Sequence, residues 1–461
     1  TMKKRLLAIA CAAAMVVTMF AGCNGGGESS TSSAAQESSG ATSSAAEDSS
    51  AAGESSTAEE SSEAAGGELS VSGDVEIEFF QQKREAVDSF QAVIDAFMEQ
   101  NPNITVTQNV VPDAATVLMT RAATNDIPEV LMHWPTDSQF VQLAQQGRLK
   151  VLDDTEALAN VMENYQDAVK FEDGHTYCIP FSGNFMGVFY DVDKFEEAGY
   201  EIPTTWDELI ALAEDIKGKG EVAFMFPDKD AWTLSQLQSN ILGKDRADSS
   251  EFYDQMDAGE TTFQDDELTV QSWEKVLQLH EYSQGDTLSL GYDQCISDFA
   301  TGTGYMFIQG SWAAPSIEAA NPDKNFDMFP MPNDSGDIQQ PLGLDTGLCL
   351  GAGVEGDAAI AAEMFLNYIA STEGAQIYAD LDHSPSCIQG VEANIPQGTG
   401  VVEILDEKGV LSMEVLPAGF EETKRSKIQQ VLIDGDIEGL LTTLTEDYMA
   451  ALESQAAQTA E

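Results

Sequence analysis

The sequence predicts an α/β protein that folds as more than one compact unit. From residue 75 onward, segments with the alternating apolar pattern of strands take turns with segments whose apolar residues recur at helical spacing. Such a rhythm favours a mainly parallel sheet with helices on both faces. The chain has 461 residues, more than the roughly 250 to 300 at which a single core stops growing. No repeat of about 20 to 50 residues recurs, which argues against a solenoid or a propeller.

The first elements follow this rhythm closely. Alternation predicts a strand at 75–80, and apolar residues at helical spacing predict a helix over 87–98. A β-rich run at 104–111 is the second strand. A short apolar strand at 128–133 comes next, and a helix that ends at Gly147 follows it.

The charge balance excludes several classes of partner. The chain contains 21 Lys and Arg against 79 Asp and Glu, a formal net charge of −58. Such a surface repels nucleic acid and anionic membranes, because binding to either needs clustered Lys and Arg. The sequence contains no phosphate-binding loop, dinucleotide fingerprint, nucleophile elbow or zinc-protease motif. The four His are scattered, and the acidic run 265–267 lacks the spacing of a calcium loop. We therefore expect no metal and no cofactor.

The N-terminal segment predicts export. Three basic residues at 3–5 precede an apolar run at 6–20, which is the pattern of a signal peptide. The run ends in Ala-Gly-Cys23, which resembles the site where bacterial lipoproteins are lipidated and cleaved. We expect a lipoprotein signal peptide at 1–22 and a lipidated Cys23, the alternative being an ordinary signal with an incidental Cys. Residues 24–68 are polar, acidic and small, so 23–68 is expected to tether a globular domain to the outer face of the cell membrane.

Four cysteines remain after the signal and Cys23 are set aside: Cys178, Cys295, Cys349 and Cys387. None is spaced like a metal-binding pair. In an exported chain they permit three disulfide pairings, and free buried thiols are equally compatible with a core of this size.

Three blocks of sequence resemble one family. They occupy 179–209, 299–312 and 362–385, and include the runs Phe-Met-Gly-Val-Phe-Tyr, Phe-Ile-Gln-Gly-Ser-Trp and Ala-Glu-Met-Phe-Leu-Asn-Tyr. Together they are similar to extracellular solute-binding proteins of the carbohydrate-importer type, relatives of maltodextrin-binding protein. In the first block, a strand ends at Asp193, which caps a short helix closed by Gly199. Thr205 and Glu208 then form a capping box.

The resemblance implies a two-lobe, periplasmic-binding-protein-like fold of type II. Lobe one would comprise 72–183 plus 345–393, and lobe two 184–344 plus 394–461. Hinge strands would join the lobes, and the ligand cleft would lie between them. The resemblance also implies a monomer without catalysis that binds a carbohydrate ligand and contacts the permease subunits of an ABC importer.

Sugar recognition requires flat apolar surfaces for the faces of the ring. Trp134 follows the strand at 128–133, and its block resembles the place where relatives present an aromatic and an acid, which also points to His133 and Asp137. Trp232 lies in a turn-rich segment and Trp312 after an apolar strand, and relatives present aromatics from both places. The alternative for each Trp is packing in the core. Trp206 and Trp273 occupy helix positions where packing is the expected role.

Hydroxyl groups require polar partners as well. The ends of strands in open α/β sheets face the ligand crevice, which points to Gln81, Gln82 and Glu85. Position in the matching blocks points to Asn184 and Asp345, for which surface or turn roles are the alternative. Lys83 and Arg84 could instead form an ion pair with Asp137 at the rim.

Two other functions fit the sequence. Any pair of the many acids could hydrolyse a surface glycan, in which case an oligosaccharide would be turned over. The same fold could also bind a polyamine or a peptide, because aromatic side chains also surround cations.

Overall fold

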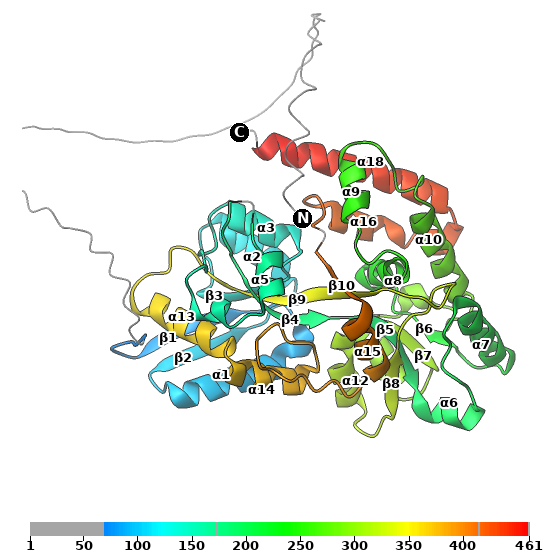
Figure 1. The fold of residues 1–461 in the computed structure, drawn as a ribbon, viewed down its shortest axis with the longest axis horizontal. Helices are drawn as coiled ribbons and strands as arrows, with labels where there is room; N and C mark the ends of the chain where they lie inside the picture. Colours follow the sequence, from blue (N-terminus) through cyan, green and yellow to red (C-terminus); the bar gives the residue numbers. More distant parts are fainter. Residues whose placement is uncertain (1–68, 172, 414, 460–461) are drawn as a thin grey trace, which may run out of the picture. The chain divides into compact units, whose positions relative to one another are not determined.

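The computed structural model describes residues 69–171, 173–413 and 415–459. The expected signal peptide, Cys23 and the expected tether lie outside these residues. The described chain forms two sheets covered by helices (Figure 1). We call the six-stranded sheet with its helices lobe one, and the four-stranded sheet with its helices lobe two. None of the helices in the described part is both long and apolar enough to cross a membrane.

Lobe one is built on strands from distant parts of the sequence. Its strands run in the order β10-β9-β3-β1-β2, and β4 also pairs with β9. β1 pairs in parallel with β2 and β3, whereas β9 runs antiparallel to β3 and β4. The bounds are β1 (Val75–Phe80), β2 (Ile104–Asn109), β3 (Val130–His133), β4 (Ile179–Asn184), β9 (Gln340–Leu350) and β10 (Gly409–Ser412).

Helices cover both faces of this sheet. Phe79 on β1 packs edge-on against Phe90 of α1 and Phe365 of α13. Its neighbour Phe80 points to the other face, where Arg121 of α2 lies over its ring. The helices of lobe one are α1 (Val87–Gln100), α2 (Ala114–Ala123), α3 (Ser138–Gln145), α4 (Glu156–Ala159), α5 (Glu163–Ala168), α13 (Gly356–Ile369) and α14 (Thr372–Asp382).

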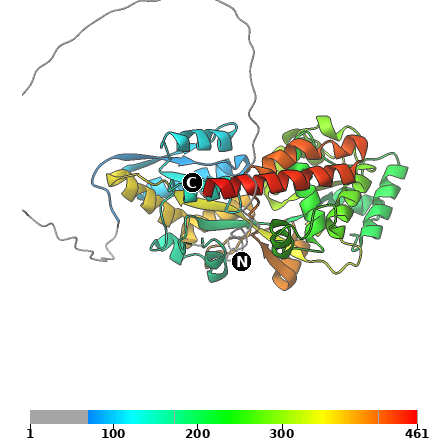
Figure 2. The same cartoon turned by 90° about the horizontal axis from the view of Figure 1, so that it is seen from above.

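Lobe two has a smaller sheet between two apolar clusters. Its order is β6-β7-β5-β8, from β5 (Met186–Asp191), β6 (Phe224–Met225), β7 (Met306–Gly310) and β8 (Phe326–Phe329). C-terminal helices join its core, and α18 packs along α16 (Figure 2). Its helices are α6 (Val192–Ala198), α7 (Trp206–Gly218), α8 (Ala231–Gly243), α9 (Ser250–Asp257), α10 (Glu267–His280), α11 (Tyr292–Ala300), α12 (Ala314–Ala320), α15 (Thr399–Lys408), α16 (Phe420–Ile428), α17 (Val431–Asp434) and α18 (Ile437–Thr459).

The expectation of a mainly parallel sheet is confirmed for the strands from which it was drawn, since β1 pairs in parallel with β2 and β3, but it does not extend to the rest of the two sheets. In lobe two, β5 runs antiparallel to both β7 and β8. In lobe one, β9 runs against β3 and β4. The physical reason is that β5 begins two residues after β4 ends, so no crossover helix separates them, and β9 returns to the first sheet from the second lobe.

Local signals in the first matching block are confirmed with one correction. The cap of α6 is Asp191 and not Asp193, because β5 runs to Asp191, whose carboxylate accepts a hydrogen bond from the Lys194 amide at 3.0 Å. Gly199 closes this helix with φ of +70°. The capping box of α7 is confirmed: the Thr205 hydroxyl accepts from the Glu208 amide, and the Glu208 carboxylate accepts from the Thr205 amide.

The chain crosses between the lobes several times, including between α14 and α15 and on either side of β10. The chain passes from β4 of lobe one to β5 of lobe two, and β9 begins beside lobe two and ends beside β3. At the start of β9, the Gln340 side chain accepts a hydrogen bond from Lys244 at the end of α8. The site described next lies around these connections.

Candidate ligand-binding site

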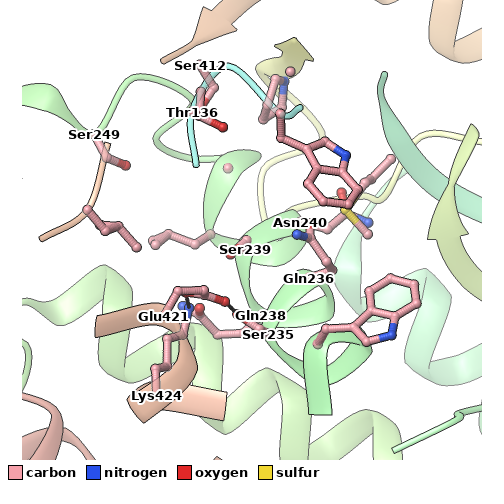
Figure 3. A pocket seen from close by; sticks show the side chains of 18 of the residues that line it. Thr136, Ser235, Gln236, Gln238, Ser239, Asn240, Ser249, Ser412, Glu421 and Lys424 are labelled. Carbon is pink, nitrogen blue, oxygen red and sulfur yellow. Dashed lines mark hydrogen bonds and ion pairs between the residues drawn. The ribbon is translucent and has the colours of Figure 1, made fainter. Parts of the chain in front are cut away.

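A cavity of about 650 Å³ is lined by residues of both lobes (Figure 3). Lobe one contributes the segment after β1, the segment after β3 and part of β9. Lobe two contributes one face of α8, the turn after β7 and the start of α16. A volume of several hundred Å³ is in the range of small-molecule sites.

The structure brings eight of the ten predicted ligand-binding residues to this cavity. Their direct contact with a ligand stays a prediction. These residues are Gln82, Glu85, Trp134, Asp137, Asn184, Trp232, Trp312 and Asp345.

Gln81 and His133 do not line the cavity. Gln81 is fully buried and its Nε2 donates to Gln108 Oε1 at 3.0 Å. His133 is buried too, and its Nδ1 accepts a hydrogen bond from the Trp134 amide at 3.0 Å. Burial lowers the pKa of His133, which favours the neutral ring. Successive residues at a strand end point to opposite sides, so only one of Gln81 and Gln82 faces the cavity.

Three half-buried tryptophans reach the cavity from three elements. Trp134 follows β3 directly. Trp232 lies in the first turn of α8 and not in a loop, because the turn-rich segment ends at Asp230, and its ring packs edge-on against Tyr292. Trp312 lies in the short turn after β7, folded back so closely that a Cβ at Gly310 would come within 2.0 Å of the indole. Only a glycine at position 310 leaves room for this arrangement of the ring.

In the cavity wall, the buried Lys83 lies between two buried carboxylates. Its Nζ is 2.7 Å from Asp345 Oδ2 and 3.0 Å from Asp382 Oδ2. Burial opposes the charge on Lys83, but these two carboxylates outweigh burial and hold its pKa well above the ordinary value. Asn184 Nδ2 donates to the other oxygen of Asp345 at 3.2 Å. The cluster fixes the orientation of two cavity-lining polar groups, Asn184 and Asp345.

The suggested rim ion pair between Lys83 or Arg84 and Asp137 is wrong. Lys83 is buried between Asp345 and Asp382. Arg84 Nη1 lies 3.6 Å from Oδ2 of Asp293, a residue of lobe two. Asp137 caps α3, because its carboxylate accepts from the Gln139 amide at 2.7 Å. Glu85 lines the cavity, and burial raises the pKa of its carboxyl group.

Sequence reasoning missed the polar face of α8. Gln236, Ser239 and Asn240 lie beside one another along the cavity (Figure 3), one to two turns after Trp232 on the same helix. The signal was present as polar residues at helical spacing, on a helix whose other positions include Leu234, Leu237 and Ile241. The turn-rich residues at 226–230 precede this helix and predict a loop, which obscures the helical periodicity that follows.

The start of α16 was missed as well. Glu421 accepts hydrogen bonds from Ser235 Oγ at 2.9 Å and from Arg425 Nε at 3.1 Å. Lys424 Nζ lies 3.7 Å from the same carboxylate. Glu421 thus holds Lys424 and Arg425 in one charged cluster at this part of the wall, where Figure 3 labels Glu421 and Lys424. Among the described residues, no group of His, Cys, Asp and Glu side chains could hold a metal ion.

The described cysteines Cys178, Cys295, Cys349 and Cys387 are free and buried. Burial raises the pKa of each thiol. The sequence left both disulfides and free thiols open, and in the structure these four cysteines are free thiols.

Comparison with known proteins identifies relatives of this chain. The family model for a bacterial extracellular solute-binding protein matches residues 92–399. The multiple sugar-binding protein of Streptococcus mutans is 28% identical over 331 residues, which cover 69% of this chain and 76% of that protein. The osmoprotective compounds-binding protein GgtB of Synechocystis is 24% identical over 233 residues, covering 47% of this chain and 55% of that one.

Solved structures show the same fold. The solute-binding protein RafE in complex with raffinose has a TM-score of 0.72 at 24% identity, over 82% of this chain and 99% of that chain. The GacH receptor of Streptomyces glaucescens has a TM-score of 0.69 at 20% identity, over 82% and 99% of the two chains. The two-lobe, type II fold expected from the sequence is thereby confirmed.

Proposed function

Because this chain belongs to the bacterial extracellular solute-binding protein family, we propose that it captures a sugar or short oligosaccharide and delivers it to an ABC importer. The observation that carries the proposal is the meeting of three half-buried tryptophans and a set of fixed polar groups at one cavity between two lobes. The names of relatives support it: one curated relative is a multiple sugar-binding protein, and one structural neighbour holds raffinose.

The cavity has the two kinds of surface that a sugar needs. Trp134, Trp232 and Trp312 offer flat apolar faces to the C–H faces of a ring. Asn184 and Asp345 offer an amide and a carboxylate whose orientation the Lys83 cluster fixes. We assign the ligand contacts to these side chains and to Gln82, Glu85 and Asp137.

The charge of the wall favours a neutral ligand over a polyamine. Of the described residues that line the cavity, five are basic and five acidic. A site for a polyamine would need an excess of carboxylates to compensate the ligand's ammonium groups. The basic residues of the wall are Lys83, Arg84, Arg246, Lys424 and Arg425. The acidic residues are Glu85, Asp137, Asp345, Glu421 and Glu422.

Three of the five acidic residues in the wall support binding without turnover. Asp345 is held by Lys83 and Asn184, Asp137 caps α3, and Glu421 is paired within its own part of the wall. A glycosidase needs two carboxyl groups on opposite sides of one bond, one of them able to donate a proton. Of the three carboxylates named here, each already has a protein partner, so we propose that the chain is not an enzyme.

A thermal-shift screen of the purified protein tests this function. The panel contains raffinose, stachyose, galactose, acarbose, xylo- and chito-oligosaccharides, spermidine and a mixed tetrapeptide pool. A ligand that binds only the native state at 100 times its Kd raises the free energy of unfolding by about 2.7 kcal/mol. We expect a shift with at least one sugar and no hydrolysis product by chromatography. A shift with spermidine or peptide alone, or release of monosaccharide, would contradict the proposal.

We further propose that Cys23 carries a lipid anchor at the outer face of the cell membrane and that 23–68 tethers the lobes to it. The motif at Cys23 supports this. Replacing Cys23 by Ser should move the protein from the membrane to the soluble extracytoplasmic fraction, with unchanged sugar affinity. A Cys23→Ser protein that stays with the membrane in cell fractionation would contradict the anchor.

We also propose the lobe boundaries expected from the sequence, 72–183 plus 345–393 and 184–344 plus 394–461, except that β10 and the start of β9 at 340–344 pair within the sheet of lobe one. The crossing from β4 to β5 at Asn184 and the position of Asp345 within β9 support them. Closure of the lobes would take its free energy from a ligand that contacts both.

A further inference from the structure

Asn240 presents an unusual side chain to the cavity. It lies on the polar face of α8, is 3% exposed, and lines the cavity beside Gln236 and Ser239 (Figure 3). Among the described residues, neither Nδ2 nor Oδ1 of its carboxamide has a hydrogen-bond partner. Leaving a buried polar group unpaired destabilises the folded protein.

A second buried asparagine of the same lobe shows the usual arrangement. Asn333 is 4% exposed, and its Nδ2 donates to Asp245 Oδ1 at 2.8 Å and to the Asp337 carbonyl at 3.0 Å. Its Oδ1 accepts from the Gly336 amide at 2.8 Å. The protein thus satisfies the carboxamide of Asn333 internally, whereas both polar atoms of Asn240, at the cavity, have no partner among the described residues.

The chemistry of the carboxamide restricts which molecule in the cavity could pair with both atoms. Nδ2 only donates and Oδ1 only accepts, and the two atoms lie side by side. A ligand carboxylate would offer acceptors alone, and an ammonium group donors alone, so each would leave one atom of Asn240 unpaired. Two hydroxyl groups on adjacent ring carbons can accept from Nδ2 and donate to Oδ1 at once.

We propose that Asn240 is a specificity-determining residue that recognises a pair of adjacent hydroxyl groups on a sugar ring. This rests on the proposed function and deepens it, because it requires a ligand with a vicinal diol next to α8. A site built to bond a hydroxyl rejects ligands that lack it, since its own buried polar group would then be unpaired.

The test compares Asn240→Leu with the matched variant Asn333→Leu. Both replace a buried carboxamide by an apolar side chain of similar size. We expect Asn240→Leu to bind raffinose or stachyose, or else the tightest sugar of the panel, roughly 10- to 100-fold more weakly by calorimetric titration. Its melting temperature without sugar should equal or exceed that of the wild type. Asn333→Leu should show the reverse, with a lower melting temperature and unchanged affinity.

Asn240→Asp provides an affinity measurement that does not depend on an apolar replacement. It keeps the shape and the acceptor but loses the donor, so we expect weaker binding than in the wild type. Equal affinity of the wild type and both Asn240 variants would overturn the proposal. So would a loss of ligand-free stability in Asn240→Leu as large as that in Asn333→Leu, because Asn240 would then have a partner within the protein. Failure of the proposed function is distinguishable, since it would appear as a wild type that binds no sugar of the panel.

Discussion

At the scale of single residues, exposure separates tryptophans that can meet a ligand from those that hold the core. Trp232 and Trp312 are half-buried at the cavity. If each supports one face of a sugar, Trp232→Ala and Trp312→Ala should each weaken binding by roughly 1–3 kcal/mol, the loss expected for a buried aromatic contact. Calorimetric titration with the sugar that the screen identifies measures this loss.

Trp206 is the control for these two variants. It is 4% exposed, packs in the core of lobe two, and its Nε1 donates to Gln278 Oε1 at 2.8 Å. Trp206→Ala should lower the melting temperature with little change in affinity, because it opens a cavity in the core. Unchanged affinity in both Trp232→Ala and Trp312→Ala would remove the ligand from this wall of lobe two.

Lys244 predicts how stability depends on pH. It is 1% exposed, and its Nζ hydrogen bonds to Gln340 Oε1 at 2.5 Å. Burial lowers the pKa of Lys244 to about 7. The unfolded chain therefore binds more protons than the native state between about pH 7 and the ordinary Lys pKa near 10.4, so this group adds stability as pH rises through that window.

The variant Lys244→Met isolates this contribution. Between pH 7 and pH 9, the free energy of unfolding of the wild type should rise relative to that of Lys244→Met by roughly 2 kcal/mol. Urea unfolding of both proteins at the two pH values measures the four free energies. Because both proteins contain the same buried thiols, the titration of these thiols cancels when Lys244→Met is subtracted from the wild type. A difference that stays constant with pH would mean that Lys244 is charged in the native state at neutral pH.

Which residues could be predicted depended on whether their signal was local. The end of β1 and the segment after β3 placed Gln82, Glu85 and Trp134 correctly at the cavity, because strand ends face the crevice. The partners of Lys83 could not be predicted, since Asp345 and Asp382 lie more than 250 positions away in the sequence. The role of Asn240 depends on the absence of such partners, which only the folded structure reveals.

At the scale of elements, the contact of α8 with β9 brings the lobes together beside the cavity. Gly243 ends α8, and a Cβ there would lie 2.6 Å from Cγ of Pro341 on β9. Gly243→Ala should therefore destabilise the protein, although replacing Gly by Ala in a helix normally stabilises it by roughly 0.4–1 kcal/mol. Thermal unfolding measures the change.

Gly218 at the end of α7 is the matched control. A Cβ at this position would meet nothing within 4 Å. Gly218→Ala should leave the melting temperature unchanged or raise it slightly. Equal effects of the two substitutions would show that the close approach of α8 to Pro341 does not constrain the connection between the lobes.

Elements with local signals were predicted well, and those set by distant pairing were not. The capping box of α7 lies within four residues, so the sequence alone reveals it. The direction of β5 is set by its partners β7 and β8, which follow more than 100 residues later. An αβ rhythm contains no information on that pairing, so the parallel arrangement predicted from the first three strands holds for them but not for β5.

At the scale of the whole molecule, the buried thiols report on each lobe separately. Cys178, Cys349 and Cys387 lie in the core of lobe one, whereas Cys295 lies in the core of lobe two. Because all four are buried, each should react with a thiol reagent only when its surroundings open. Peptide mapping of labelled Cys295 and Cys349 therefore measures the opening of the two lobes independently in one sample.

A sugar that contacts both lobes should protect both thiols. Opening of either lobe would release such a ligand, so at 100 times its Kd the labelling of Cys295 and of Cys349 should each slow by about 100-fold when opening and closing are rapid. A ligand held by one lobe alone would slow only the thiol in that lobe. Labelling with and without the panel sugar, followed by peptide mapping, distinguishes the two cases. Protection confined to Cys349 would place the ligand on lobe one and contradict binding between the lobes.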